Sequence, residues 1–120
     1  MKEKNKRKKG LEGEKVAINF LLENNYEILE NNFYCRYGEI DIVAKKENII
    51  IFIEVKYRKN ANFGEPEEAV SLKKIKAICK TALYYITSKE LQDNINFRFD
   101  VISIKDKELK HIISAFDFIS

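Results

Sequence analysis

The sequence has 120 residues, which is enough for one hydrophobic core and short for two ordinary domains. Its 45% hydrophobic content, beside 34% charged residues, excludes a wholly disordered chain. The net charge of +3 comes from residues 1–10, which hold six basic side chains and one acidic one, so a site for a polyanion elsewhere requires local clustering of lysine and arginine.

Few residues are available for zinc or nucleophile chemistry. The single histidine, His111, and the two cysteines, Cys35 and Cys79, are far apart in sequence and form no CxxC pair. This excludes most zinc sites and cysteine–histidine nucleophiles, so carboxylates and lysines must carry any chemistry. We expect His111 to face solvent from a strand and both cysteines to be packing thiols. We expect the pair Tyr84–Tyr85 to pack in the core and at its rim.

No segment of the sequence suggests export or insertion into a membrane. The longest uninterrupted apolar run, residues 49–53, is far shorter than the roughly 20 residues that span a bilayer. No secretory h-region follows the charged start. We therefore expect a cytoplasmic protein with no membrane contact.

A helix is predicted near the start of the chain. Residues 1–9 are rich in lysine and lack an apolar anchor, so we expect a disordered basic arm there and a single folded domain over 10–120. Asn24 and Asn25 are typical residues at which a helix stops. A helix over 10–24 is predicted by apolar residues at i, i+3 and i+4 spacing, which are Ala17, Phe20 and Leu21.

Three strands are expected after this helix. Segments rich in β-branched and aromatic residues predict strands over 26–35, 39–44 and 49–56. The polar run 45–48 predicts a tight hairpin, so the second and third strands are antiparallel. The third strand is apolar at five consecutive positions, 49–53, which indicates burial on both faces in the middle of a sheet.

A second helix and two more strands complete the pattern. A loop over 60–66 precedes a long helix, broken at Asp93 and Asn94, with core positions at Ile75, Ile78, Cys79, Ala82, Leu83 and Ile86. Strands are predicted over 97–104 and 109–114, and the helical crossover makes the fourth strand parallel to the third. The predicted fold class is α/β, with an αβββαβ core, a mixed sheet flanked by helices and one extra C-terminal strand.

The register of the hairpin brings two carboxylates together. If the hairpin turns symmetrically about its two central residues, Asp41 lies opposite Glu54 and Glu39 lies opposite Lys56. All four side chains then share one face of the sheet, because side chains alternate along a strand. The other face carries the apolar pairs Ile40 with Val55, Ile42 with Ile53 and Ala44 with Ile51.

Asp41 and Glu54 form a candidate metal site, because opposed carboxylates destabilise a sheet unless a cation lies between them. Mg²⁺ prefers carboxylate oxygens, carbonyls and water, and Lys56 could position a water or neutralise developing charge. The alternative is a set of ordinary strand-end charges without metal, with Lys56 in salt bridges to Glu54 and Glu39, and the pattern leaves both open. Asp100, on the neighbouring strand, is either structural or at the border of this site.

Basic residues gather after the third strand. They are Lys56, Arg58 and Lys59 at the end of the strand and Lys73, Lys74, Lys76 and Lys80 on the second helix. A phosphate backbone could bind to this group, which makes candidate nucleic-acid-binding residues of Arg58, Lys73, Lys74 and Lys76. The alternative is a solvated helix face.

Several motifs follow one another in order along the chain. They are Gly38-Glu39-Ile40-Asp41, Phe52 to Lys56 with Arg58, Phe63-Gly64 with Pro66, Ala69-Val70, Arg98 to Val101, and Ala115-Phe116. Together they closely resemble the YraN-like family of small bacterial proteins, and the resemblance covers nearly all of the chain after the basic arm. That family is similar to a branch of the PD-(D/E)XK nuclease superfamily, nearest to the archaeal Holliday-junction resolvases.

This resemblance implies a restriction-endonuclease-like core and Mg²⁺-dependent cleavage of DNA, with Mn²⁺ as a substitute ion. By motif, Asp41 and Glu54 would be metal ligands, Lys56 the catalytic lysine, and Glu14 a helical glutamate that assists metal binding. Glu14 could equally be a first-turn glutamate favoured by the helix dipole. Ile40 stands where the superfamily has proline, a departure that leaves the acidic position intact. The likeness to resolvases also suggests a homodimer.

Two functions therefore compete. The first is a metal-dependent endonuclease that hydrolyses DNA phosphodiester bonds, with branched or unusual DNA structures as candidate substrates. The second is a non-catalytic nucleic-acid-binding module on a nuclease-like fold, whose binding would survive chelation of metal. A protein-binding adaptor is a third hypothesis, which an absence of DNA affinity at low salt would favour.

Overall fold

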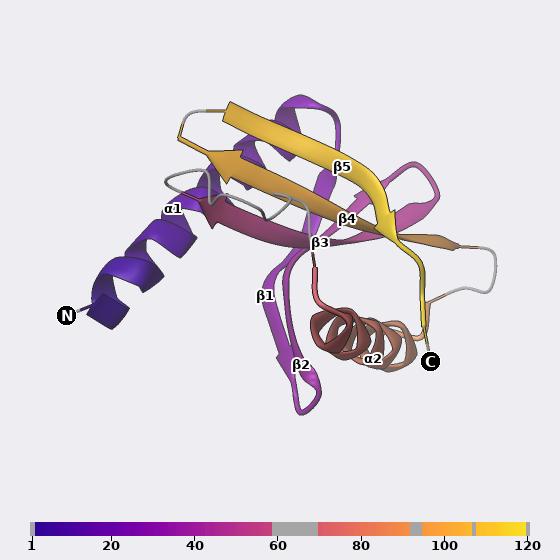
Figure 1. Ribbon diagram of the computed structural model, residues 1–120. Helices are drawn as coiled ribbons and strands as arrows, with labels where there is room; N and C mark the ends of the chain where they lie inside the picture. Colours follow the sequence, from indigo (N-terminus) through magenta and orange to yellow (C-terminus); the bar gives the residue numbers. More distant parts are fainter. Residues whose placement is uncertain (1, 59–69, 92–94, 107, 120) are drawn as a thin grey trace.

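A mixed five-stranded sheet flanked by two helices forms the centre of the molecule, as the sequence predicted (Figure 1). The computed structural model describes residues 2–58, 70–91, 95–106 and 108–119. The predicted loop over 60–66 and the predicted break at 93–94 lie outside these residues. The elements are α1 (Lys2–Glu23), β1 (Glu27–Cys35), β2 (Gly38–Lys46), β3 (Ile49–Arg58), α2 (Leu72–Ser88), β4 (Asn96–Lys105) and β5 (Glu108–Phe116).

The strands lie side by side in the order of the chain, β1-β2-β3-β4-β5. Neighbours joined by short turns are antiparallel, whereas β3 and β4 are parallel, with Ile49 beside Asn96 and Arg58 beside Lys105. A parallel pair needs a crossover connection, which the segment containing α2 provides. The predicted strand directions are therefore confirmed.

The first helix starts earlier than the apolar pattern predicted. It begins at Lys2 and so includes the segment that was expected to be a disordered arm. Lysine, arginine and glutamate have high helix propensity, so a helix anchored by its later turns can continue back through such a segment. An apolar pattern predicts the helical residues that repeat at core spacing, and it does not indicate how far the helix continues beyond them.

The predicted end of this helix is confirmed. The Asn25 N–H donates to the Leu22 carbonyl at 3.2 Å, and the Tyr26 N–H donates to the Leu21 carbonyl at 2.9 Å. Asn25 itself adopts a left-handed conformation, with φ of 68°. These are the features of a Schellman motif, in which asparagine tolerates the left-handed position that satisfies the last carbonyls of the helix.

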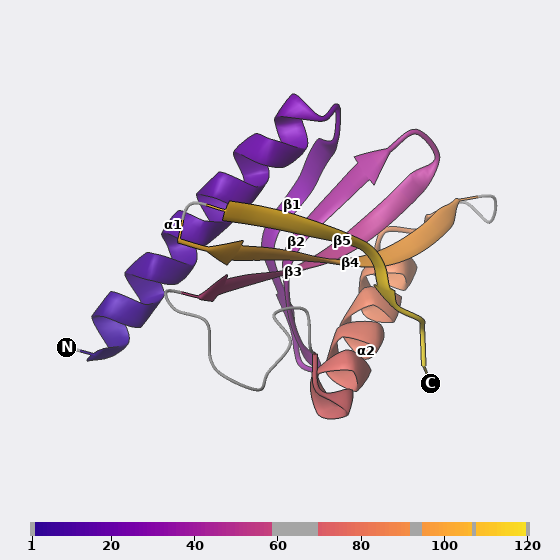
Figure 2. The ribbon, with the colours of Figure 1, turned by 45° about the horizontal axis from the view of Figure 1, so that its top comes forward.

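The two helices cover opposite faces of the sheet (Figure 2). Under α1 lies a cluster that includes Ala17, Leu21, Ile42, Ala44, Ile51 and Ile53, and under α2 lies a cluster that includes Val43, Ile50, Phe52, Ile78, Ala82 and Tyr85. The strand β3 contributes to both clusters, which confirms its predicted burial on both faces. Neither helix in the described part of the chain combines the length and the hydrophobicity that a membrane-spanning helix requires.

One predicted core position and one predicted sheet face are wrong. Leu83 is 52% exposed, because the buried stripe of α2 passes through Ala82 and Tyr85, and Leu83 is rotated away from it. Ile40 was predicted on the face of Ile42, but it belongs to the cluster under α2. The β2 residues pair with β3 only from Ile42 to Lys46. Before Ile42 the strand pairs with β1 alone, and its twist there turns Ile40 to the other face of the sheet.

The prediction for the tyrosine pair is confirmed, since Tyr85 is buried and Tyr84 is exposed.

Asp100 is a structural residue at the centre of a buried hydrogen-bond network. Its carboxylate accepts hydrogen bonds from Arg98 Nε at 2.8 Å, Arg98 Nη2 at 2.9 Å and the Ser114 N–H at 3.0 Å, and it lies 2.7 Å from His111 Nε2. Burial alone would raise the pKa of Asp100, but the bonds from His111, Arg98 and Ser114 outweigh it and hold the pKa below its ordinary value. The network therefore joins β4 to β5 through an ionised carboxylate.

His111 was predicted to face solvent, and this prediction is wrong. Its side chain is 9% exposed and makes edge-to-face contacts with Phe20 and Tyr26, with ring centroids 5.8 and 5.9 Å apart. His111 lies beside Ile102, which faces α1, so the end of that helix covers the imidazole. The packing of α1 across β5 is a tertiary contact that the local pattern of β5 does not report.

We predict that Asp100→Asn lowers the free energy of unfolding by about 2–4 kcal/mol near neutral pH, because it leaves Arg98 in a part-buried place without its charged partner. Urea unfolding measures the change. The ionised form of Asp100 stabilises the folded state above the ordinary aspartate pKa, and this contribution is lost as the pH falls through the lowered folded-state pKa. The deficit should therefore shrink in acid. The exposed Asp117→Asn is the control and should unfold as wild type does.

Candidate functional site

The β2 and β3 strands separate at two acidic residues. Ile42 lies opposite Ile53 in the last ladder pair, so Asp41 and Glu54 come next on the two strands. The hairpin register from Ile42 to Lys46 is the one that the sequence predicted. Beyond it, the Val55 N–H donates to Asp41 Oδ2 at 2.8 Å. The Asp41 side chain thus bridges to the backbone of β3, where the strand backbones no longer pair.

The two carboxylates interact unfavourably in this place. Burial raises the pKa of Asp41 to about 6, although the hydrogen bond from the Val55 N–H opposes this change. Burial and then the charge of Asp41 raise the pKa of Glu54 to about 7. Both groups are therefore poised to take up a proton or a cation near neutral pH. Raised carboxylate pKa values of this kind cluster at functional sites, which makes the pair a candidate site.

Two lysines lie close enough to lower the pKa of Glu54. The first is Lys74 of α2, whose Nζ is 3.7 Å from Glu54 Oε1, and the second is Lys56 of β3. Lys74 was predicted to bind nucleic acid, and no sequence pattern indicated that it approaches Glu54. This contact depends on how closely α2 packs on the sheet. The packing is close at Gly38, because a Cβ placed on this residue would lie 3.6 Å from the Cβ of Ala77 in α2.

Glu14 lies near the site but is held by another partner. Its Oε2 accepts a hydrogen bond from Asn32 Nδ2 at 3.0 Å. Burial raises its own pKa despite this bond, and its charge contributes to the raised pKa of Asp41. Because α1 begins at Lys2, Glu14 is in mid-helix, and the interpretation of Glu14 as a first-turn glutamate is wrong.

Gly13 allows α1 to approach β3 closely beside Glu14. A Cβ at this glycine would lie 3.1 Å from Cδ2 of Tyr57. Glycine inside a helix costs about 1 kcal/mol relative to alanine, so its presence in α1 is explained by this close approach. The contact holds Glu14 near the edge of β3.

The other predicted nucleic-acid-binding residues lie on or near α2. Lys73 and Lys76 are exposed on α2, on the same face as Lys80. The backbone of Arg58 ends β3 beside Lys105, but its side chain lies outside what the structure describes, as does Lys59. Lys74 therefore connects the exposed lysines of α2, its neighbours on that helix, with the carboxylate pair.

The residues present suit a metal ion that takes few protein ligands. Among the described residues, no three acidic, histidine or cysteine side chains come close enough to hold an ion. Asp41 and Glu54 remain a pair of hard oxygen donors whose mutual repulsion an ion would relieve. Mg²⁺ commonly binds one or two carboxylates and completes its shell with water and substrate phosphate, so the pair fits it. The role of Glu14 in assisting metal binding stays a prediction, and its carboxylate is already bonded to Asn32.

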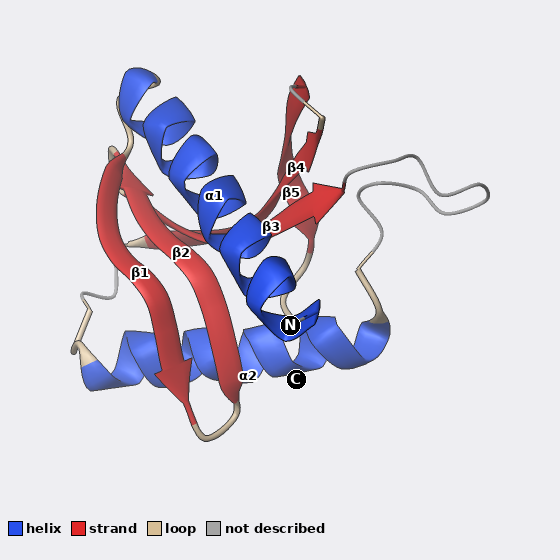
Figure 3. Cartoon of the chain, turned by 90° about the vertical axis from the view of Figure 1, so that its left-hand side faces the viewer, coloured by secondary structure: helices blue, strands red, loops and turns tan. Residues whose placement is uncertain are grey.

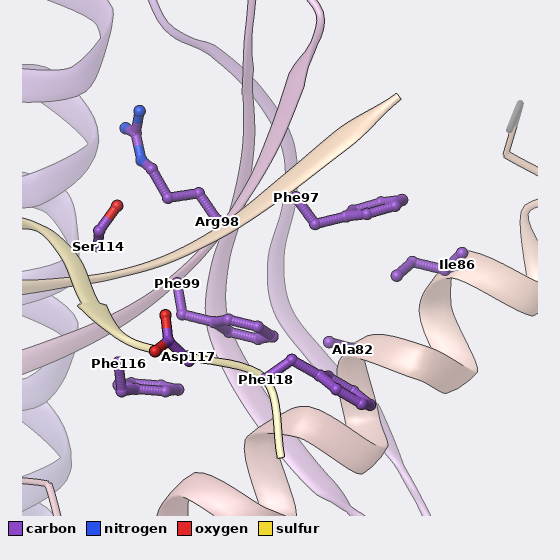
Figure 4. A pocket seen from close by; sticks show the side chains of 9 residues that line it. All are labelled: Ala82, Ile86, Phe97, Arg98, Phe99, Ser114, Phe116, Asp117 and Phe118. Atoms are coloured by element: carbon purple, nitrogen blue, oxygen red, sulfur yellow. The ribbon is translucent and has the colours of Figure 1, made fainter. Parts of the chain in front are cut away.

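A separate cavity of about 210 Å³ lies away from these carboxylates (Figure 4). The aromatic rings of β4 and of the C-terminal segment surround it, together with Ala82 and Ile86 of α2. Arg98 also lines it, but its guanidinium is bonded to Asp100 and points away from the rings. The lining is mainly apolar, and none of the predicted site residues contributes to it. The cavity is therefore separate from the candidate site at Asp41 and Glu54.

Comparison with known proteins identifies the family. The pattern of the uncharacterised protein family UPF0102 matches residues 13–104, a range that contains both carboxylates and both lysines of the site. This chain belongs to the UPF0102 family. It is 50% identical over 114 residues to a UPF0102 protein of Clostridioides difficile, with 93% of this chain and 99% of that protein covered. It is 44% identical over 113 residues to one of Lachnoclostridium phytofermentans, with 94% and 96% covered.

We predict that removing either charge of the carboxylate pair stabilises this UPF0102 protein. In metal-free buffer at about pH 8, Asp41→Asn and Glu54→Gln should each raise the free energy of unfolding by about 1–3 kcal/mol. The folded-state pKa values lie above the ordinary 3.8 and 4.5, so the wild type loses stability as the pH rises from about 4 towards 7 and above. Asp41→Asn should give the larger gain, because it leaves the contact between Glu54 and Lys74 in place.

Urea unfolding of each variant at about pH 4 and pH 8 tests this. The gain should nearly vanish at the lower pH, where the wild-type pair is largely protonated. The exposed Glu12→Gln on α1 is the matched control and should behave as wild type at both values. Variants no more stable than wild type at about pH 8 would show that the pair is not under electrostatic strain.

Proposed function

We propose that this protein is a metal-dependent endonuclease that hydrolyses phosphodiester bonds in DNA. The observation that carries the proposal is the partly buried pair Asp41 and Glu54, whose raised pKa values favour uptake of a cation. The resemblance of the motifs around these residues to the PD-(D/E)XK nucleases supports the same conclusion. Branched and otherwise unusual DNA structures are the first substrates to test.

The proposed roles follow from where each group lies. Asp41 and Glu54 would hold Mg²⁺, and Mn²⁺ as a substitute, through carboxylate oxygens. The ion would supply activation of a water molecule and neutralisation of the charge that develops on the phosphate. The Val55 N–H fixes the orientation of the Asp41 carboxylate, so that its second oxygen is left for the ion.

Lys56 and Lys74 would act on the phosphate and the water. Lys56 affects Glu54 electrostatically from the same strand, so its ammonium group can orient the attacking water or bind a phosphate oxygen. Lys74 lies 3.7 Å from Glu54 and is 42% exposed, so it is close to the pair and also accessible to a ligand. We assign to Lys74 the neutralisation of Glu54 before the ion binds and a phosphate contact afterwards.

DNA is the proposed substrate because of the charge on α2. Lys73, Lys76 and Lys80 present their side chains to solvent along one face of this helix, next to the lysine that contacts Glu54. A line of ammonium groups binds phosphate independently of base sequence. The line would place a phosphate backbone beside the carboxylate pair.

A second function is favoured by one specific observation. The described residues bring no third carboxylate into the pair, and Lys74 already neutralises Glu54 in part. A nucleic-acid-binding module without catalysis would need no more than this. Such a module would bind DNA equally well after chelation of metal, and its affinity would be indifferent to Glu54→Gln.

Cleavage assays test the endonuclease proposal. Labelled duplex, flap and four-way-junction DNA should be cut in the presence of Mg²⁺ and left intact with a chelator. Asp41→Asn, Glu54→Gln and Lys56→Ala should each lower the cleavage rate at least about 100-fold, because each removes a group that stabilises the transition state. Lys89→Ala removes one charge from the end of α2 far from the pair and should cut as wild type does. Equal cutting by wild type and Asp41→Asn would contradict the proposal.

Calorimetric titration with Mg²⁺ or Mn²⁺ tests the metal site without a substrate. We predict that the wild type binds the ion and that Asp41→Asn does not. The affinity of the wild type should increase as the pH rises from about 6 to 8, because protons and the ion compete for the pair. Glu14→Gln should change the affinity little, since the Glu14 carboxylate is already bonded to Asn32. Equal ion binding by wild type and Asp41→Asn would place the ion elsewhere.

A further inference from the structure

An aromatic and basic hollow lies against α2, away from the carboxylate pair. The cavity measures about 350 Å³ and is lined by Tyr37, Lys80, Leu83, Tyr84 and Thr87. Tyr37 comes from the turn between β1 and β2, which reaches α2 as seen in Figure 3. A Cβ at the next residue, Gly38, would be only 3.4 Å from Thr81 Oγ1 of α2, so the turn is packed directly on this helix.

The side chains of the hollow are those that bind a flat ring attached to a phosphate. Tyr84 is 44% exposed and Tyr37 40% exposed, and their ring centroids are 6.4 Å apart. The guanidinium of Arg36 lies 4.9 Å from the Tyr37 ring centroid and donates a hydrogen bond to Tyr37 Oη at 2.7 Å. Aromatic rings stack on nucleobases, and lysine and arginine beside them bind the linking phosphates. A purely apolar partner would not use these charges.

Two paths along the backbone connect the hollow to the carboxylate pair. Along β2, Tyr37 lies four residues before Asp41, which corresponds to about 13 Å in a strand. Along α2, Lys74 lies ten residues before Tyr84, which corresponds to about 15 Å in a helix. Lys76 and Lys80 lie on α2 between these two ends. A stacked strand rises 3.4 Å per nucleotide, so the separation corresponds to about four nucleotides.

We propose that this hollow binds an unpaired nucleobase of the DNA substrate, about four nucleotides from the bond at the carboxylate pair. The inference rests on the proposed function for the nature of the substrate, and it adds the class of DNA. A base inside a duplex cannot stack on a protein ring, so the hollow selects DNA that contains a single-stranded segment. The lysines between the two places hold the phosphates of the intervening strand.

The test measures binding and not cleavage. Full-length Asp41→Asn protein in chelator is titrated with a fluorescently labelled duplex that carries a short thymidine tail, and with the same duplex carrying an abasic tail of equal length. The two tails have the same phosphate charge, so a difference in affinity reports contacts to the bases. We expect the base-bearing tail to bind about tenfold more tightly.

Substitutions at Tyr84 locate this difference on the protein. Tyr84→Leu keeps an apolar side chain but removes the ring, and it should bind both tails with equal affinity. Tyr84→Phe keeps the ring and should retain the preference. Tyr34→Leu alters another tyrosine, 65% exposed and not part of the lining, and should also retain it.

Each outcome separates this inference from the proposed function. Equal binding of the two tails by the parent protein, or a preference that persists in Tyr84→Leu, overturns the inference. Base-dependent binding that requires a ring at Tyr84, in a protein whose wild type cuts no DNA, supports the inference and contradicts the endonuclease. Cutting by the wild type without any dependence on tail bases overturns the inference alone.

Discussion

The repulsion between Asp41 and Glu54 is the constraint on which the site depends. Strand pairing brings the two residues to the end of one ladder, and a backbone amide of β3 fixes one of them there. The backbones of both residues are held by the neighbouring ladder pair, and the Asp41 carboxylate by the Val55 N–H, so folding keeps the two acidic groups near each other. A positively charged ligand gains affinity from this arrangement, because the protein has already brought the like charges together.

The other buried carboxylate, Asp100, shows the opposite balance. Four polar contacts reach its oxygens, and its pKa is lowered. In the pair, Asp41 accepts a backbone hydrogen bond and Glu54 lies near a lysine, yet both pKa values are raised. The two sites are close in the sheet, since Asp100 lies beside Ile53 on β3. One molecule thus contains a carboxylate that stabilises the fold and a pair that costs stability. A loss of folding stability of this kind is expected at a surface whose residues serve ligand binding.

The regular parts of the fold could be predicted from the sequence, and the contacts between layers could not. Period-two alternation and a symmetrical turn were enough to place Asp41 and Glu54 at the same end of the hairpin. Ile40 was placed on the wrong face because β2 twists where it pairs with β1 alone, before it meets β3. His111 was wrong because α1 covers it, and the approach of Lys74 to Glu54 depends on how α2 packs. These contacts arise from tertiary packing, which local periodicity does not encode.

The parallel pairing of β3 with β4 also bears on the order of folding. The strands from β1 to β3 form a meander of neighbouring hairpins, whereas β4 must join across the whole α2 segment. Contacts between distant parts of a chain form slowly, because a long loop must close first. We therefore expect the meander to form first, and it is the part that contains the carboxylate pair. Acidic conditions that protonate the pair should speed the early steps of folding as well as stabilise the finished sheet.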